Sequence, residues 1–223
     1  KETFAGEPNG VTRSYGKIYV TNTGSRTDVF DAETYEFITC IGTGTWGEGG
    51  YQTVHAFDVT ASQGAVFIRD KRKLVVVLEQ DVQPGSAARV PIYSRSVNLQ
   101  EAMGTYAVAA RNDGFLYVTA QNKNMIYLFD PADIRAGDTG FAPYLVALGF
   151  EKSPQSIAFV GDRLFVTLRV DDKRSELWEI SPKNGKLLQD FTDSMVYPEK
   201  IAGARHTLLV VDRATPTVKA IGL

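Results

Sequence analysis

Few residues of this chain have the types and spacing that catalysis or metal binding requires. The chain has two histidines, His55 and His206, and one cysteine, Cys40. Because the sequence contains no H-x-E, H-E-x-x-H or C-x-x-C spacing, it does not predict a zinc site. We expect His206 on the surface, in a tight turn, and Cys40 as a buried structural thiol within a strand. Ser153-Pro154-Gln155-Ser156 lacks the flanking glycines of a nucleophile elbow.

The segment from Thr43 to His55 is the most distinctive candidate for ligand binding. Its glycine-rich run carries two aromatic residues, Trp46 and Tyr51, and leads to His55. Aromatic rings flanked by polar groups suit stacking against a sugar or another planar ligand. The alternative is that Trp46 plugs a channel mouth or packs between repeats. A phosphate cradle is not predicted, because such a loop needs a helix N-terminus after it and none follows here.

Five similar sequence segments recur along the chain at a near-constant spacing. Each places a small or polar turn before four or five residues of apolar, β-branched or aromatic character. Four strands with their turns fill such a spacing, which is the length of one β-propeller blade. We call the last apolar residue of each segment its anchor. The five anchors lie 48, 50, 48 and 44 residues apart: Val20, Ile68, Val118, Val166 and Val210.

Individual strands can be placed within these repeats. The first repeat predicts strands near residues 11–14, 17–22, 27–30 and 37–41, and the fourth predicts strands at 156–160, 164–168, 176–180 and 187–191. Turn-forming residues separate the third strand from the fourth, as in Asp31–Thr34 and Ser181–Gly185. No segment keeps a helical period over three turns, so the pattern indicates an all-β protein.

The two ends of the chain complement each other. The fifth repeat has only three strands, and an extra extended piece, Glu2–Gly6, precedes the first repeat. We expect this piece to pair as the missing strand of the last blade, which would close the ring and cover its edges. A two-sheet sandwich needs no such period, and solenoid coils are shorter. The sequence therefore predicts one all-β domain over residues 1–223, a β-propeller of about five four-stranded blades, with six blades as the alternative.

The repeated segments resemble NHL repeats and the repeats of the related SMP-30-like propellers. The similar elements are a Gly-x-x-Tyr/Phe-Val strand, an apolar strand ending in Asp-Pro or Asp-Ala, and a blade opener. That opener reads Ser153-Pro154-Gln155-Ser156-Ile157-Ala158 and returns as Tyr197-Pro198-Glu199-Lys200-Ile201-Ala202. Members of these families bind proteins, RNA or carbohydrates, or hydrolyse small substrates, so the resemblance implies the fold but not one function.

The SMP-30-like hydrolases hold a divalent metal through acidic and asparagine side chains in their channel. In this chain no Glu-Asn-Asp set falls at matching blade positions, so the sequence does not predict the metal site that such a hydrolase needs. We therefore expect no catalytic residue, no metal ion and no cofactor, and favour a protein that is not an enzyme. The oxygen ligands that a metal would have to use are Asn22, Glu48, Asp58, Asn122 and Glu199.

Loops that follow the second strand of each blade emerge together on one face of a propeller. The position three residues after each anchor carries Thr23, Lys71, Gln121, Arg169 and Arg213. Such a polar, basic ring favours carboxylates, phosphates or acidic sugars through charge-assisted hydrogen bonds. The alternative is a solvated rim whose charges pair with neighbouring aspartates. The predicted ligand-binding residues are Trp46, Tyr51, His55, Lys71, Gln121, Arg169 and Arg213.

Charge and composition restrict the possible partners. The 24 Lys and Arg residues against 26 Asp and Glu leave a formal charge of −2, without the basic excess of a duplex nucleic-acid binder. No run of about 18 apolar residues predicts a membrane span. A single cysteine allows no intrachain disulfide. Since the chain begins at Lys1 rather than Met, we expect an exported protein in an extracytoplasmic location: periplasmic, secreted or on the cell surface.

Together these features favour a non-catalytic, monomeric binding module that presents its top face to a glycan or protein partner. The alternative function is a metal-dependent hydrolase or lyase of the SMP-30 or lactonase type acting in the central channel. A third is a structural propeller domain excised from a larger assembly, which would expose an apolar patch.

Overall fold

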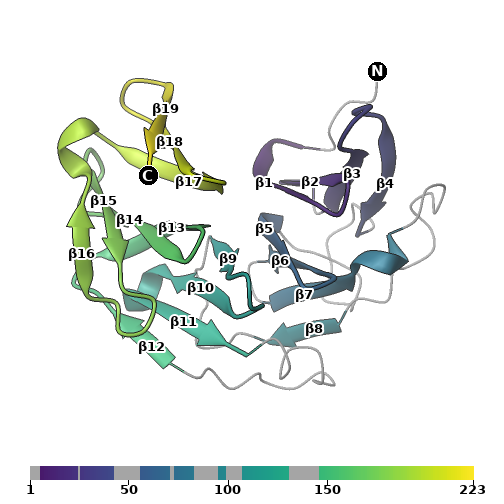
Figure 1. The fold of residues 1–223 in the computed structure, drawn as a ribbon, viewed down its shortest axis with the longest axis horizontal. Helices are drawn as coiled ribbons and strands as arrows, with labels where there is room; N and C mark the ends of the chain where they lie inside the picture. The colour runs from purple at the N-terminus through teal and green to yellow at the C-terminus, as the bar shows by residue number, and fades with distance from the viewer. Residues whose placement is uncertain are drawn as a thin grey trace. The chain divides into compact units, whose positions relative to one another are not determined.

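The computed structural model describes residues 6–24, 26–42, 56–70, 73–82, 95–98, 107–130 and 146–223. In these residues the regular elements are β-strands and short 3-10 turns. The strands form five antiparallel sheets, the blades of a five-bladed β-propeller (Figure 1). No helix among the described residues is long and apolar enough to span a membrane. The chain divides into two compact units, one holding blades 1 and 2 and the other blades 3 to 5.

The first unit consists of two four-stranded blades in which neighbours along the chain pair in order. Its core is formed by buried aliphatic residues of both blades around the fully buried Tyr19. Blade 1 contains β1 (Pro8–Ser14), β2 (Lys17–Asn22), β3 (Arg26–Asp31) and β4 (Phe37–Ile41). Blade 2 contains β5 (Ala56–Ser62), β6 (Ala65–Asp70), β7 (Lys73–Leu78), the 3-10 turn η1 (Glu79–Asp81) and β8 (Arg95–Asn98).

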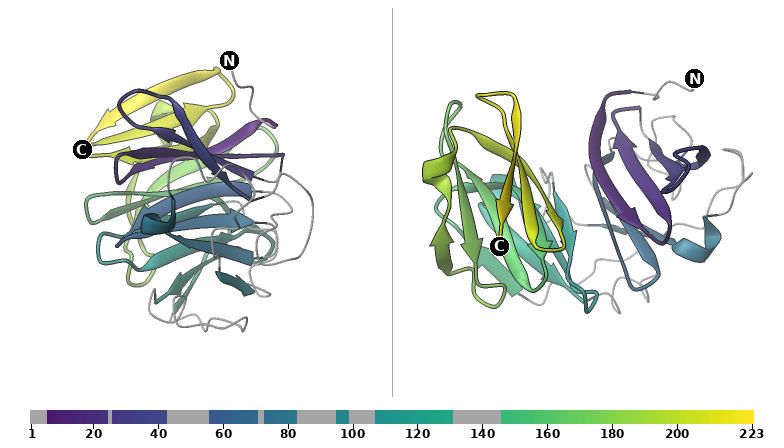
Figure 2. Two further views of the ribbon diagram at one scale, coloured as in Figure 1. Left: turned by 90° about the vertical axis from the view of Figure 1, so that its right-hand side faces the viewer. Right: turned by 45° about the horizontal axis from the view of Figure 1, so that its top comes forward.

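The second unit contains blades 3 to 5 and two apolar cores, one around Tyr117 and Leu164 and one around Phe165 and Leu208. Blade 3 contains β9 (Val108–Ala110), β10 (Leu116–Ala120), the 3-10 turn η3 (Gln121–Lys123), β11 (Met125–Phe129) and β12 (Val146–Gly149). Blade 4 contains β13 (Ser153–Val160), β14 (Arg163–Arg169), β15 (Ser175–Ile180), β16 (Leu187–Asp190) and the 3-10 turn η4 (Thr192–Ser194). Blade 5 contains β17 (Pro198–Ala204), β18 (Thr207–Asp212) and β19 (Thr217–Gly222), drawn in yellow in Figure 2.

The five anchors confirm the predicted repeat. Each lies in the second strand of its blade and pairs with an aliphatic residue of the first strand. The blade number is therefore five rather than six. The pairs are Val20 with Val11, Ile68 with Val59, Val118 with Val108, Val166 with Ile157, and Val210 with Ile201.

The structure describes the C-terminal blade but not the first five residues of the chain. Blade 5 has three strands within the described residues, as the pattern predicts. Residues 1–5 lie outside the described residues, so the pairing of Glu2–Gly6 with the last blade stays a prediction. The single domain over residues 1–223 also stays a prediction.

The first strands of blades 1 and 4 begin three residues earlier than predicted, because their pairing with the second strand continues on the far side of a one-residue β-bulge near each start. The register shifts between Pro8 and Gly10 in β1, and between Pro154 and Ser156 in β13. Strand β17 has the same shift after Pro198. Proline lacks the N–H of a ladder bond and is tolerated at a strand start, and the extra residue that follows it turns its side chain out of register.

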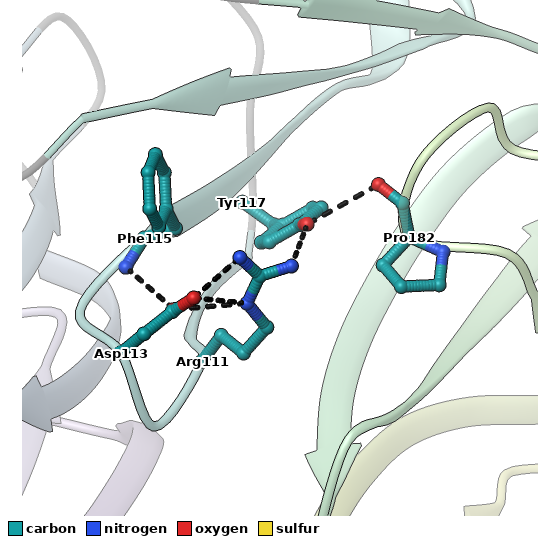
Figure 3. Close-up of polar contacts among 5 residues, drawn as sticks. All are labelled: Arg111, Asp113, Phe115, Tyr117 and Pro182. Atoms are coloured by element: carbon teal, nitrogen blue, oxygen red, sulfur yellow. Dashed lines mark hydrogen bonds and ion pairs between the residues drawn. The ribbon is translucent and has the colours of Figure 1, made fainter.

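A polar network ties blade 3 to blade 4 at the end of the strands where β10 begins (Figure 3). The guanidinium of Arg111 donates through Nε to both carboxylate oxygens of Asp113, at 2.8 and 2.9 Å. Its Nη1 also donates to the hydroxyl of Tyr117 at 3.3 Å. Tyr117 in turn donates to the carbonyl of Pro182 in the β15–β16 turn at 3.2 Å, which links the two blades.

Replacing Tyr117 by phenylalanine is expected to lower the free energy of unfolding by about 1 kcal/mol, since it removes both hydrogen bonds of a buried hydroxyl. Urea unfolding at neutral pH measures the change. The control is Tyr35→Phe, because Tyr35 is 71% exposed. Equal stability of the two variants would contradict a bridging role for the Tyr117 hydroxyl.

Candidate functional site

A polar cavity of about 390 Å³ lies in the second unit, where the second strands of blades 3 to 5 end. Three residues predicted from their spacing after the anchors line it together: Gln121, Arg169 and Arg213. The remaining lining residues are Gln155, Asp172, Tyr197, Glu199 and Lys200. Three blades therefore contribute side chains to one cavity.

The three predicted residues reach the cavity from equivalent positions. Gln121 opens η3 directly after β10, Arg169 is the last residue of β14, and Arg213 directly follows β18. The carbonyl of Gln121 accepts a hydrogen bond from the Ser153 hydroxyl at 3.2 Å, which joins blade 3 to blade 4. Because the second strands share one direction in their blades, their final residues gather at one end.

Two further cavity residues, Gln155 and Glu199, come from the bulges after Pro154 and Pro198. The prediction of ligand-binding residues missed both, although both lie in the repeated blade opener. The signal was the proline followed by a polar residue at the start of a strand, since a bulge redirects the side chain that follows.

Blade 4 holds the backbone of the Glu199 bulge through three hydrogen bonds. The Thr167 hydroxyl donates to the Glu199 carbonyl at 3.1 Å, and Ser175 donates to the carbonyl of Pro198 at 2.8 Å. The Ser156 hydroxyl accepts the N–H of Ile201 at 3.2 Å. All three hydroxyl groups belong to buried residues, so the position of β17 beside the cavity is well defined.

The charges of the cavity wall are partly paired. Arg169 forms an ion pair with Asp172, which raises the pKa of the guanidinium. Arg213 Nη1 lies 3.4 Å from Glu199 Oε1, and its guanidinium carbon lies 5.7 Å from the ring centre of Tyr197. Lys200 adds a third cation against the two carboxylates, so the wall carries one net positive charge. The predicted pairing of rim charges holds for Arg169 with Asp172.

A buried side-chain oxygen in the wall, that of Gln155, has no hydrogen-bond partner among the described residues. The side-chain oxygen Oε1 of Gln155 is buried and accepts no hydrogen bond within the described part of the chain. A buried acceptor without a donor costs about 1–3 kcal/mol.

The carboxylate of Asp212 holds the backbone next to the cavity residues Tyr197 and Arg213. Its side chain is fully buried, and its carboxylate accepts the N–H groups of Val196 at 3.1 Å, Tyr197 at 3.0 Å and Ala214 at 3.2 Å. Burial alone would raise the pKa of this carboxyl, but these three bonds and Lys219 lower it below the usual 3.8. Asp212 therefore fixes the backbone on both sides of Arg213 and beside Tyr197.

The other predicted residues fall in different places. Trp46, Tyr51, His55 and Lys71 lie outside the described residues, so their roles stay predictions. His206 lies in the exposed turn between β17 and β18, and Cys40 is buried, as expected. Across the described ranges, no group of three or more His, Cys, Asp or Glu side chains is placed to hold a metal ion.

Comparisons with known proteins show the fold. No family model matches the sequence, and no curated protein matches it. Similar solved structures include the Pan2 WD40 domain of Neurospora crassa (TM-score 0.65, 10% identity, 98% of this chain and 63% of that one). Virginiamycin B lyase from Staphylococcus aureus matches with TM-score 0.59 and 12% identity over 98% of this chain and 71% of that one. A chain of the nidogen/laminin complex matches with TM-score 0.65 and 16% identity over 98% and 77%.

These likenesses extend over almost the whole chain and support the β-propeller fold. At such low identities they carry no statement about activity or ligand. The chain spans less than two thirds of the Pan2 chain that it matches.

Proposed function

We propose that this protein is a non-catalytic binding module whose cavity on blades 3 to 5 takes an acidic sugar of a glycan. The observation that carries the proposal is the convergence of Gln121, Arg169 and Arg213 from three blades on one polar cavity. Its volume of about 390 Å³ falls within the range of about 300–1,000 Å³ that is usual for small-ligand sites.

The types of side chain favour a sugar over an apolar ligand. Two amides, two carboxylates and two guanidinium groups can exchange hydrogen bonds with ring hydroxyls, and Tyr197 offers an aromatic face. A sugar can therefore use both the polar groups and the aromatic face of the wall.

The charge favours an acidic sugar over a neutral one. A guanidinium binds a carboxylate through two parallel hydrogen bonds, which are stronger than bonds between neutral groups. Asp172 is 85% exposed and Arg213 65% exposed, and ion pairs between exposed groups contribute only about 0–1 kcal/mol. A carboxylate of the ligand can replace such a partner at little cost.

Calorimetric titration with tetragalacturonate tests the proposal. We expect saturable binding that weakens as salt is added, and at least tenfold weaker binding of the carboxyl-reduced tetrasaccharide, because charge-assisted bonds contribute about 1.5–3 kcal/mol. Arg169→Gln is expected to weaken binding by about tenfold or more, and Arg169→Lys by less.

Arg163→Gln is the matched control. Arg163 begins the strand β14 that Arg169 ends, and it too is ion-paired, with Glu179 Oε2 at 2.6 Å from its Nη2. Both substitutions change the net charge by the same amount. Equal effects of the two on affinity would mean that only overall charge matters, and the proposed site would be wrong.

The NHL-like character of the blades and the extracytoplasmic location belong to the same proposal. The repeated opener with its proline and polar bulge residue supports the former. The lyase among the similar structures offers no separate argument for catalysis, since that likeness concerns the fold alone.

A further inference from the structure

The turn between β14 and β15 brings a carboxylate, that of Asp172, to the wall of the polar cavity. The turn is closed by its backbone, since the N–H groups of Val170 and Asp171 donate to the carbonyl of Arg174 at 3.0 and 3.1 Å. The carboxylate of Asp171 accepts the N–H of Lys173 at 2.8 Å and so stabilises the turn as well. These bonds leave the side chain of Asp172 available for another role.

The carboxylate of Asp172 lies on the guanidinium of Arg169, where its Oδ1 accepts a hydrogen bond from Nη2. Both side chains line the cavity. The carboxylate therefore holds the place on Arg169 that the acidic group of a ligand would take. Because Asp172 is largely exposed and Arg169 is 44% exposed, water and salt weaken this ion pair, and a ligand can displace it.

The backbone of Arg169 is held in place without Asp172. Arg169 pairs with Ser153 in β13 on one side and with Ser175 in β15 on the other. Ser175 is itself buried, and its hydroxyl donates to the carbonyl of Pro198 at 2.8 Å. Since two strands already fix the base of Arg169, the carboxylate of Asp172 acts as a competitor of the ligand more than as a support for the guanidinium.

The short connection between the two residues makes this competition effective. Asp172 follows Arg169 by three residues, and a group on so short a tether has an effective concentration on the order of millimolar or more. An anion from solution must exceed that concentration or gain further contacts with the wall, such as Tyr197 and Arg213. Small anions without such contacts are thereby kept off Arg169, which is specificity through an opposing element.

We propose that Asp172 determines the specificity of the cavity, as a tethered carboxylate that occupies Arg169 in the free protein and is displaced by the acidic group of the ligand. This inference rests on the proposed function in that it concerns the same cavity. It adds that the parent protein binds each anion more weakly than Arg169 alone would allow, by one common factor.

Inorganic phosphate is the probe, because it tests the competition without a sugar. Nuclear magnetic resonance of the ¹⁵N-labelled protein in 0.1 M salt follows the side-chain Nε–H signal of Arg169, which Arg169→Gln identifies by its loss. We expect Asp172→Asn to lower the phosphate concentration at half-saturation by about two- to fivefold, the strength of an exposed ion pair. The variant should melt as the parent does, since the turn keeps its backbone bonds.

Asp171→Asn is the matched control, with the same change of charge one residue away. Its amide oxygen can still accept the N–H of Lys173, and charges at the surface are screened within about 10 Å, so we expect less than about 1.5-fold tighter phosphate binding. The proposal is overturned if the Arg169 signal of Asp172→Asn does not respond to phosphate, if its half-saturation is no lower than that of the parent, or if Asp171→Asn gains as much. The expected phosphate result without binding of tetragalacturonate would refute the glycan proposal and leave the competition by Asp172 standing.

Discussion

Gly203→Ala is expected to destabilise the second unit by about 3 kcal/mol or more, at the upper end of overpacking effects. A Cβ at Gly203 in β17 would lie 1.8 Å from the carbonyl oxygen of Phe159 in β13 and 2.8 Å from its carbon. These are backbone atoms, so no side-chain rotation relieves the clash. The first strands of blades 4 and 5 would have to move apart. For a chain of this size the melting temperature should fall by about 6 °C or more.

Gly222→Ala is the matched control for Gly203→Ala. Its Cβ would meet nothing within 4 Å, and its backbone does not need a positive φ. Calorimetric melting should therefore place this variant within about 0.5 kcal/mol of the parent. Similar melting of both variants would show that β13 and β17 do not approach as closely as described.

The Gly203 substitution also bears on function. The bulges that carry Gln155 and Glu199 lie on the same two strands, β13 and β17. Separation of these strands would widen the cavity, so Gly203→Ala should weaken the binding of tetragalacturonate although Gly203 does not line the cavity.

Asp212→Ala is expected to lower the free energy of unfolding by about 3 kcal/mol or more. The change removes a buried carboxylate that accepts three backbone N–H groups, and each donor left without an acceptor costs about 1–3 kcal/mol. The loop with Val196 and Tyr197 should lose its hydrogen-exchange protection first. Asp212→Asn keeps one acceptor oxygen and should cost less.

The lowered pKa of Asp212 also predicts how stability depends on pH. The carboxylate is favoured in the folded state, so its contribution is present above the unfolded pKa of about 3.8. As the pH falls below that value towards the folded pKa, protons bind the unfolded chain first and the contribution is lost. The stability of Asp212→Asn should accordingly fall less steeply below pH 3.8 than that of the parent.

Asp190→Asn is the control for both measurements, since the carboxylate of Asp190 is exposed and accepts the N–H of Thr192 at 2.8 Å. We expect a change of about 0.5 kcal/mol or less. If Asp212→Asn were as stable as Asp190→Asn and kept the acid slope of the parent, Asp212 would not hold the loop.

The repeat could be predicted from sequence because it rests on burial. Four of the anchors (Ile68, Val118, Val166 and Val210) are fully buried and Val20 is partly buried, so an apolar residue recurs at this position and leaves a visible period. The places of Gln121, Arg169 and Arg213, three positions after their anchors, could be predicted for the same reason, since they follow from the strand ends.

Other features left weaker signals. Gln155 and Glu199 reach the cavity through bulges, which break the alternation on which strand prediction depends. The need for glycine at 203 arises from a strand 44 residues earlier in the chain, so no local pattern reveals it. The three N–H bonds of Asp212 likewise depend on the folded loop.

A crystal structure of the protein with bound tetragalacturonate tests the central claim most directly. We predict a carboxylate of the sugar within hydrogen-bond distance of Arg169 or Arg213. An empty cavity at saturating ligand, or a sugar bound on another face, would contradict the proposal that blades 3 to 5 form a binding site for acidic sugars.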